Sequence, residues 1–307
     1  MHPHHPFDAP GAIDTRSPAA VAGAIDAMLG RRFRGWEGPL LHEAFDNVGR
    51  LYAGERHGYL RCDTPFHDLR HALESALAAA RLVDGWEIGA AGARGSLGGD
   101  MALLAVVLAL LHDVGFLRSD AERRMHGASF MAQHEARSIE FAERWLERTP
   151  LRPFAALARL IDATRVDSSI EALSGGETHR VVARIIATAD VLAQLADRCY
   201  LEKCRDFLYA ELVEAGMARG TGGRHANASY WSPEDLLGRT PQFIDRRVTS
   251  RLDTGLGGVH RLMRTHFGGD DPYAAAVAGN LAHLRAVLAD ARFDLLRRRP
   301  TAVFAED

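Results

Sequence analysis

A continuous apolar run that ends abruptly in two polar residues constrains the fold of this chain most. Every residue from Met101 to Leu111 is apolar, and His112 and Asp113 follow directly. The run is far short of the roughly 20 residues that a membrane span needs, so it predicts a helix buried on all sides. A histidine and an aspartate are costly to bury unless something binds them. We therefore expect a helical core with a polar centre at the end of this helix.

Helical patterns dominate the rest of the chain, and alternating strand patterns are scarce. Alanine and leucine, both strong helix formers, recur throughout. An all-α fold is the prediction, with a helix that Asp63 or Thr64 caps and Pro65 begins. The expected helices cover about residues 18–29, 39–53, 65–84, 100–111, 135–148, 153–164, 178–197, 200–218 and 232–299, the last with a break at 268–272.

Composition changes divide the chain into three parts. Residues 1–35 are rich in proline, alanine and glycine and are expected to be partly flexible, and a glycine-rich break lies near residue 220. We expect a main domain over 36–218 and a C-terminal helical extension over 219–307 that packs on it. The glycine-rich stretch 89–99 lacks the ending of a phosphate-binding loop and follows no strand, so it predicts a plain loop before a helix that Asp100 caps.

Charge and cysteine content narrow the function classes. The net charge of −3, from 37 basic and 40 acidic residues in 307, argues against a protein that grips a nucleic-acid polymer by bulk charge. No membrane association is expected. The three cysteines form no C-x-x-C pair, which favours reduced thiols and a cytoplasmic location.

Two further positions can complete a polar centre. His67 and His71 are four residues apart on the predicted helix, so they lie on one face and can serve one site. Asp190 is the one carboxylate within the apolar stretch Ile185–Leu192. A buried carboxylate must be protonated, paired or bound to a metal. Taken singly, each of these residues is more often an ordinary core or surface residue.

The order of these residues resembles a known family. A histidine, a His-Asp pair and an aspartate on successive helices look like the HD superfamily of metal-dependent phosphohydrolases. The segment from Phe66 to Ala72 further resembles the Tyr-His-Asn-x-x-His-Ala signature of class I cyclic-nucleotide phosphodiesterases. The resemblance covers roughly residues 60–215 and implies an HD-type helical bundle in which 36–218 is the catalytic domain and the C-terminal helices are additional.

The resemblance implies roles for particular residues. His71, His112, Asp113 and Asp190 would bind one divalent metal, and Asp113 would bridge to a second. One or two ions of Mn, Mg, Fe or Zn fit this mixed set of ligands. Asp113 is thereby also a catalytic residue, because it would hold the metal hydroxide that attacks phosphorus. His67 would protonate the leaving oxygen as general acid.

Other residues are candidates for a second metal or for the substrate. The segment with His126, His134 and Glu135 resembles a helix start found in many bacterial HD proteins, and Glu135 equally suits a plain helix N-terminus. Arg165 and Lys203 can meet a phosphate, although each is more often a solvated charge.

The sequence also departs from the phosphodiesterase pattern. Phe66 and Asp68 replace the usual tyrosine and asparagine, and Phe116 stands where many relatives have a histidine. The sequence has no match to the glutamine and the aromatic clamp that bind the purine in these phosphodiesterases. The resemblance therefore does not identify the substrate of this chain. The aromatic residues of the C-terminal third fit a pocket wall, a homodimer contact or plain core packing.

Three functions remain open. The leading hypothesis is hydrolysis of a phosphodiester or phosphomonoester in a nucleotide or cyclic nucleotide, with a small phosphorylated substrate as the partner. The second is a di-iron oxygenase of the HD type, which would need His126 and His134 as further iron ligands. The third is a non-catalytic nucleotide-binding regulatory module. This hypothesis is less favoured, because the residue types needed to bind the metal are all present.

Overall fold

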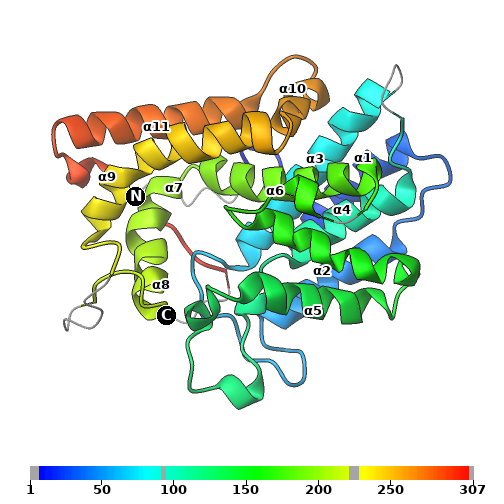
Figure 1. Ribbon diagram of the computed structural model, residues 1–307, viewed down its shortest axis with the longest axis horizontal. Coiled ribbons are helices and arrows are strands. Elements are labelled where there is room, and N and C mark those ends of the chain that lie inside the picture. Colours follow the sequence, from blue (N-terminus) through cyan, green and yellow to red (C-terminus); the bar gives the residue numbers. More distant parts are fainter. Residues whose placement is uncertain (1–6, 91–94, 174, 221–227, 304–307) are drawn as a thin grey trace.

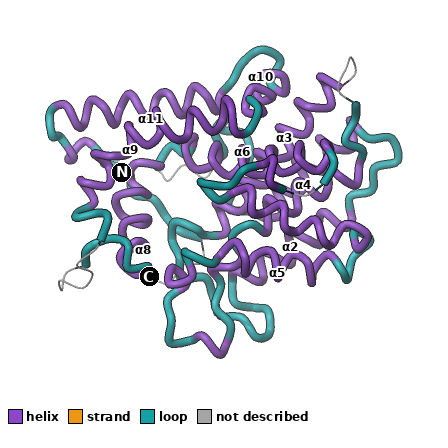
Figure 2. Tube along the Cα trace, in the orientation of Figure 1, coloured by secondary structure: helices purple, strands orange, loops and turns teal. Residues whose placement is uncertain are grey.

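The computed structural model describes residues 7–90, 95–173, 175–220 and 228–303 (Figure 1). Most of these residues are helical, and they form no sheet (Figure 2), which confirms the all-α prediction. The helices are α1 (Pro18–Arg32), α2 (Pro39–Tyr52), α3 (Leu69–Ala90), α4 (Gly99–Leu111), α5 (His134–Leu146), α6 (Glu177–Ala196), α7 (Tyr200–Lys203), α8 (Tyr209–Glu214), α9 (Pro233–Phe243), α10 (Leu262–His266) and α11 (Pro272–Ala289).

Helices α3, α4 and α6 form the centre of the molecule. Every residue of α3 from Leu69 to Gly85 is buried, and so is every residue of α4 from Met101 to Leu111. Helix α3 packs against α1, α4, α6 and α10, so it is enclosed on all sides. Alanine and leucine are therefore covered on every face of this helix and not on one stripe alone.

The apolar run at α4 also passes a length and hydropathy test for a membrane span, over Gly99–Phe116. In the fold 89% of that stretch is buried, as expected of a core helix. The helix begins one residue after Gly98, and Asp100 lies in its first turn. The expectation that Asp100 caps α4 is therefore wrong.

The start of α3 differs from the sequence prediction. The helix begins at Leu69, and Asp68 caps it by accepting a hydrogen bond from the backbone N–H of His71 at 3.0 Å. Asp63 instead accepts from the N–H of Gly127 at 3.0 Å, and the Thr64 hydroxyl donates to the carbonyl of His67 at 3.1 Å. These bonds hold the segment before Asp68 in a non-helical path, so His67 is not on the helix that carries His71.

The C-terminal helices contact the central ones. Helix α9 begins as expected, with the Ser232 side chain accepting from the N–H of Asp235. Helix α11 lies along α6, and α10 lies against α3 (Figure 1). Helix α11 ends at Ala289, about ten residues earlier than predicted, and the chain then returns to the centre. There the N–H of Val303 donates to Asp68 Oδ2 at 2.7 Å.

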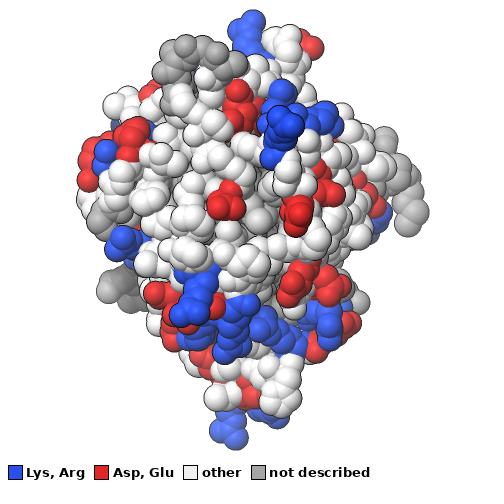
Figure 3. Space-filling view, turned by 90° about the vertical axis from the view of Figure 1, so that its right-hand side faces the viewer, with Lys and Arg blue, Asp and Glu red and all other residues white. Residues whose placement is uncertain are grey.

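Figure 3 shows one face of the molecule, on which basic and acidic groups lie close together and leave much of the surface uncharged. This face therefore carries no field of a single sign. The three cysteines are free, and Cys62 and Cys204 are buried.

Candidate metal centre

Four side chains from three helices meet in the interior. His71 comes from α3, His112 and Asp113 from the end of α4, and Asp190 from α6. Their exposed fractions are 2–3% for the first three and 9% for Asp190. The sequence placed all four as candidates, and the fold brings them together.

The ligand atoms surround one point. Nε2 of His71 lies 3.2 Å from Nε2 of His112 and 3.3 Å from both Asp113 Oδ2 and Asp190 Oδ1. Nε2 of His112 lies 3.2 Å from Asp113 Oδ2 and 3.5 Å from Asp190 Oδ1. Two ligands bound at about 2.1 Å to one transition metal are separated by about 3.0–3.5 Å. His71, His112 and Asp190 also stand out as a metal-ligand cluster by distance alone.

The backbone at the end of α4 makes this cluster possible. The helix ends at Leu111, and a short 3₁₀ turn, Val114–Phe116, lets His112 and Asp113 serve one site although they are neighbours. A Cβ on Gly115 would lie 2.0 Å from the carbonyl oxygen of His134. Gly115 is therefore needed for the close approach of α5 and not for a left-handed backbone conformation, since its φ is not positive.

The carboxylates and imidazoles of the cluster shift one another's pKa. Burial acts to lower the pKa of His71, but the carboxylates of Asp113 and Asp190 outweigh it and raise that pKa to about 9. Burial acts to raise the pKa of Asp190, but the two imidazoles outweigh it and lower it. The same opposition raises the pKa of His112 and lowers that of Asp113. Without a metal, the two carboxylates are therefore ionised and the two imidazoles protonated, so that their charges balance, and a divalent ion that binds here has to displace the imidazole protons.

The donor set fits a divalent metal. Nδ1–H of His112 donates to the carbonyl of Ala109 at 2.8 Å, so Nε2 can offer its lone pair to the centre. Asp113 Oδ2 is buried and has no well-aligned hydrogen-bond partner among the described residues, although two imidazoles lie within 3.3 Å. Nε2 of His71 and Nε2 of His112 lie 3.2 Å apart, and this oxygen lies within 3.3 Å of both, so the three atoms are close enough together to bind one ion.

A second position lies beside Asp113. His134, the first residue of α5, donates from Nδ1 to the carbonyl of Met131 at 2.7 Å, and its Nε2 lies 3.5 Å from Asp113 Oδ1. Glu135 is 9% exposed and lies 3.4 Å from the His134 ring. Asp113 thus faces the first cluster with one oxygen and His134 with the other, which is the arrangement of a bridging carboxylate.

Comparison with known families agrees with this geometry. Residues 68–200 match the family model of the HD domain. The central part of the chain is therefore similar to an HD domain. The match includes all four cluster residues, and HD domains bind divalent metals on a fold of the metal-dependent hydrolase type. No curated protein matches the sequence of the chain.

His67 lies just before the matched part of the HD domain and next to its cluster. Its ring centroid is 6.1 Å from that of His71 and 6.3 Å from that of His134. Its Nδ1 lies 2.5 Å from Oε2 of Glu211, a fully buried carboxylate of α8 whose Oε1 accepts from the N–H of Phe66 at 2.7 Å. Burial acts to lower the pKa of His67, but the Glu211 carboxylate outweighs it and raises that pKa.

Phe116 lies between two histidines of the site. Its ring stacks on His67 at 4.4 Å and on His134 at 4.3 Å, each at an interplanar angle of 17°. The residue that departs from the family pattern therefore spaces His67 from His134. No sequence pattern indicated this role, nor that of Glu211, which follows His67 by 144 positions.

The remaining candidates lie in different surroundings. His126 accepts the N–H of Ala128 at Nδ1, and its Nε2 lies 3.9 Å from Asp63, so its contacts are outside the cluster. Lys203 is buried and lies 2.5 Å from Asp197. Arg165 is half-exposed and lies 3.7 Å from Glu135, at the edge of the site. The structure therefore brings Arg165 near the site, but neither His126 nor Lys203.

Proposed function

We propose that this HD domain is a metal-dependent phosphohydrolase that cleaves a phosphoester, with a phosphodiester of a nucleotide or cyclic nucleotide as the favoured substrate class. The observation that carries the proposal is the pairing of His67 with buried Glu211 at 2.5 Å, beside the four-ligand cluster. A phosphodiester releases a poor alkoxide leaving group, and a positioned acid speeds its departure.

The residues of the chain divide the work as follows. Nδ1–H of His67 donates to Glu211, which leaves Nε2–H of the charged ring available to the leaving oxygen. A divalent metal held by His71, His112, Asp113 and Asp190 supplies a Lewis acid for the phosphoryl oxygens and lowers the pKa of water. Arg165 lies near enough to Glu135 to meet a further oxygen of the substrate.

The oxygenase alternative has weaker support. It needs both His126 and His134 at a second iron, and Nδ1 of His126 is occupied by the N–H of Ala128. The position of His134 opposite Asp113 favours a two-metal site, which serves phosphoester hydrolysis equally well. An iron absorption band that changes when oxygen and a reduced protein are mixed would point to the oxygenase instead.

Metal analysis and a substrate panel test the proposal. The purified protein is assayed with Mn²⁺ and Mg²⁺ on cyclic nucleotides, nucleoside monophosphates and bis(p-nitrophenyl) phosphate. His67→Ala should keep its metal and lose about 10²–10⁴-fold in turnover on an alkyl phosphodiester. It should lose much less on the p-nitrophenyl ester, whose leaving group needs no proton.

His126→Ala serves as the matched control, because this histidine is close in sequence to α5 but outside the cluster. It should leave metal content and turnover unchanged. Absence of metal from the wild-type protein, or loss of metal from the His67→Ala protein, would overturn the assignment of roles.

A further inference from the structure

A cavity lies on another side of the helices that carry the metal ligands. It has a volume of about 470 Å³ and is bounded by α3, the end of α6, α11, and the segments around Asp8 and Arg298. Its size falls in the range of small-molecule sites. Its floor includes Ala193, Ala196 and Gly279, whose small side chains leave the space open. None of the metal ligands borders it.

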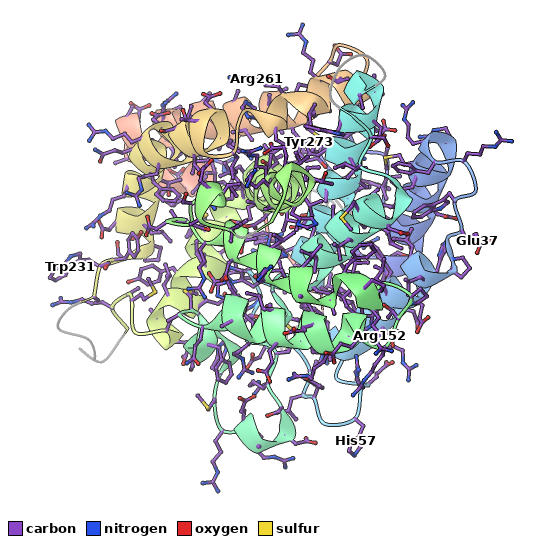
Figure 4. The ribbon with its side chains drawn as sticks, turned by 45° about the vertical axis from the view of Figure 1, so that its right-hand side comes forward. Glu37, His57, Arg152, Trp231, Arg261 and Tyr273 are labelled. Carbon is purple, nitrogen blue, oxygen red and sulfur yellow. The ribbon has the colours of Figure 1, made fainter. Side chains whose placement is uncertain are left out.

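The carboxylates of this cavity are already paired. Glu74 accepts from Nε of Arg70 at 2.8 Å, and Asp197 lies 2.5 Å from Nζ of Lys203. Asp8 forms an ion pair with Arg81, which also donates to the hydroxyl of Tyr273 at 2.7 Å. Figure 4 shows Tyr273 between α11 and the interior. Because each acid has its own cation, the carboxylates offer little charge to a ligand.

The groups at the cavity that lack a close ion pair are basic. Arg198 is exposed, and neither it nor His283 forms a salt bridge within the part of the chain that the structure describes. Arg298 donates to the carbonyl of Arg198 at 2.7 Å and forms a long ion pair, of 4.0 Å, with the buried carboxylate of Glu202. Two guanidinium groups and an imidazole from three separate elements thus converge on one cavity. Such groups recognise phosphate oxygens.

Two further groups suit the rest of a ligand. Asn280 donates through Nδ2 to the carbonyls of Leu195 and Asp197 at 2.9 and 2.8 Å, so its orientation is fixed and its Oδ1 remains an acceptor. Phe7 also lines the cavity, so an apolar side chain forms part of its wall.

We propose that this cavity is a second ligand site, which takes a small phosphate-bearing molecule with a planar body. Arg198 and Arg298 bind its phosphate, and Asn280 and Phe7 contact the body. The site is connected to the metal centre through the chain itself. Arg70 precedes the ligand His71 on α3, and Asp197 follows the helix that carries Asp190. A ligand bound in this cavity therefore contacts residues next to the metal ligands on α3 and α6.

Adenosine 5′-monophosphate is the probe for a calorimetric titration of the full, metal-loaded protein. We expect binding that weakens at least tenfold in the double variant Arg198→Ala/Arg298→Ala. Gly279→Phe should block binding without removing a charge, because nothing lies within 4 Å of a Cβ at this helical position. Arg297→Ala is the matched control, since Arg297 is exposed and outside the cavity, and should bind like wild type.

The outcomes separate this site from the metal centre. If the probe does not bind, or binds the two cavity variants as tightly as wild type, the second site does not exist. Binding that depends on Arg198 and Arg298 supports it, whether or not the protein hydrolyses any phosphoester. Conversely, hydrolysis lost in His67→Ala leaves this proposal untouched, because the titration reads binding and not turnover.

Discussion

Phe116 shows how an apolar residue can position two polar ones. Its ring contacts His67 on one face and His134 on the other, and misplacing a catalytic group by about 1 Å can cost about 10²-fold in rate. We expect Phe116→Leu to lower kcat about 10–100-fold with little change in KM, while the content of tightly bound metal stays the same. Steady-state kinetics and elemental analysis measure both.

Phe141→Leu controls for the loss of a buried ring. Phe141 is 8% exposed and packs edge-on against Tyr59 at 6.0 Å, away from the four-ligand cluster. The Phe141→Leu variant should lose about as much stability as Phe116→Leu does, but its kcat should stay at the wild-type value. Equal kcat in the two variants would show that Phe116 only fills space.

Glu211 is expected to set the pH range in which His67 carries its proton. Its carboxylate raises the pKa of His67, so Glu211→Gln should lower it. An acid that must be protonated then loses its proton at a lower pH, and the alkaline limb of the kcat profile moves to lower pH. Rates measured between pH 6 and 9 show the shift.

Glu214→Gln is the companion variant for this test. Glu214 lies on the same helix as Glu211 but is exposed. Its pH profile should match that of the wild type. A Glu211→Gln profile that keeps its alkaline limb would mean that Glu211 only anchors the backbone of Phe66.

Local patterns explain why the sequence predicted some of these residues and not others. His112 and Asp113 end a fully apolar helix, and Asp190 interrupts another, so each is an anomaly within a few residues. Glu211 belongs to a short segment with a second glutamate, Glu214, and looks like part of a solvated face. Only the tertiary fold distinguishes the buried one, and the role of each candidate in the chemistry stays a prediction.

At the scale of elements, α3 depends on one glycine to pack against α10. A Cβ on Gly85 would lie 2.2 Å from the carbonyl oxygen of Leu262, which is a backbone atom and cannot rotate away. Gly85→Ala should therefore destabilise the protein by about 1–3 kcal/mol, the usual cost of overpacking. Chemical denaturation followed by circular dichroism measures the change.

Gly89→Ala on the same helix is expected to change the stability in the opposite direction. Gly89 is exposed, and a Cβ added to it would have nothing within 4 Å. Alanine is the better helix former, so this variant should gain about 0.5–1 kcal/mol. If both variants shifted stability in the same direction, the close contact between α3 and α10 would not be what requires Gly85.

The boundaries of α3 show where local signals fail. Asp63, Thr64 and Pro65 form a good helix start in isolation, yet Glu211 binds the N–H groups of Phe66 and His67 at 2.7 and 3.4 Å. Those bonds replace the first helical turn, and they involve a residue far along the chain. The interiors of α3, α4 and α6 were predictable because their apolar patterns are long, whereas their ends depend on such distant partners.

At the scale of the whole molecule, the metal centre joins the three central helices. Without an ion, two ionised carboxylates remain in the interior with only imidazoles to balance them. A metal that binds the folded state alone adds about 2.7 kcal/mol at a hundredfold excess over its Kd. For a chain of 307 residues that corresponds to roughly 4 °C in Tm.

Treatment with a chelator should therefore lower Tm by roughly this amount, and adding back Mn²⁺ should restore it. His112→Ala should abolish the difference between the metal-loaded and the stripped protein, because it removes a ligand from the centre of the cluster. His126→Ala should keep the full difference, since its ring contacts Asp63 and Ala128. If the wild-type protein melts at one temperature in both states, the cluster binds no metal that stabilises the fold, and its charges must be balanced by protons on the two histidines.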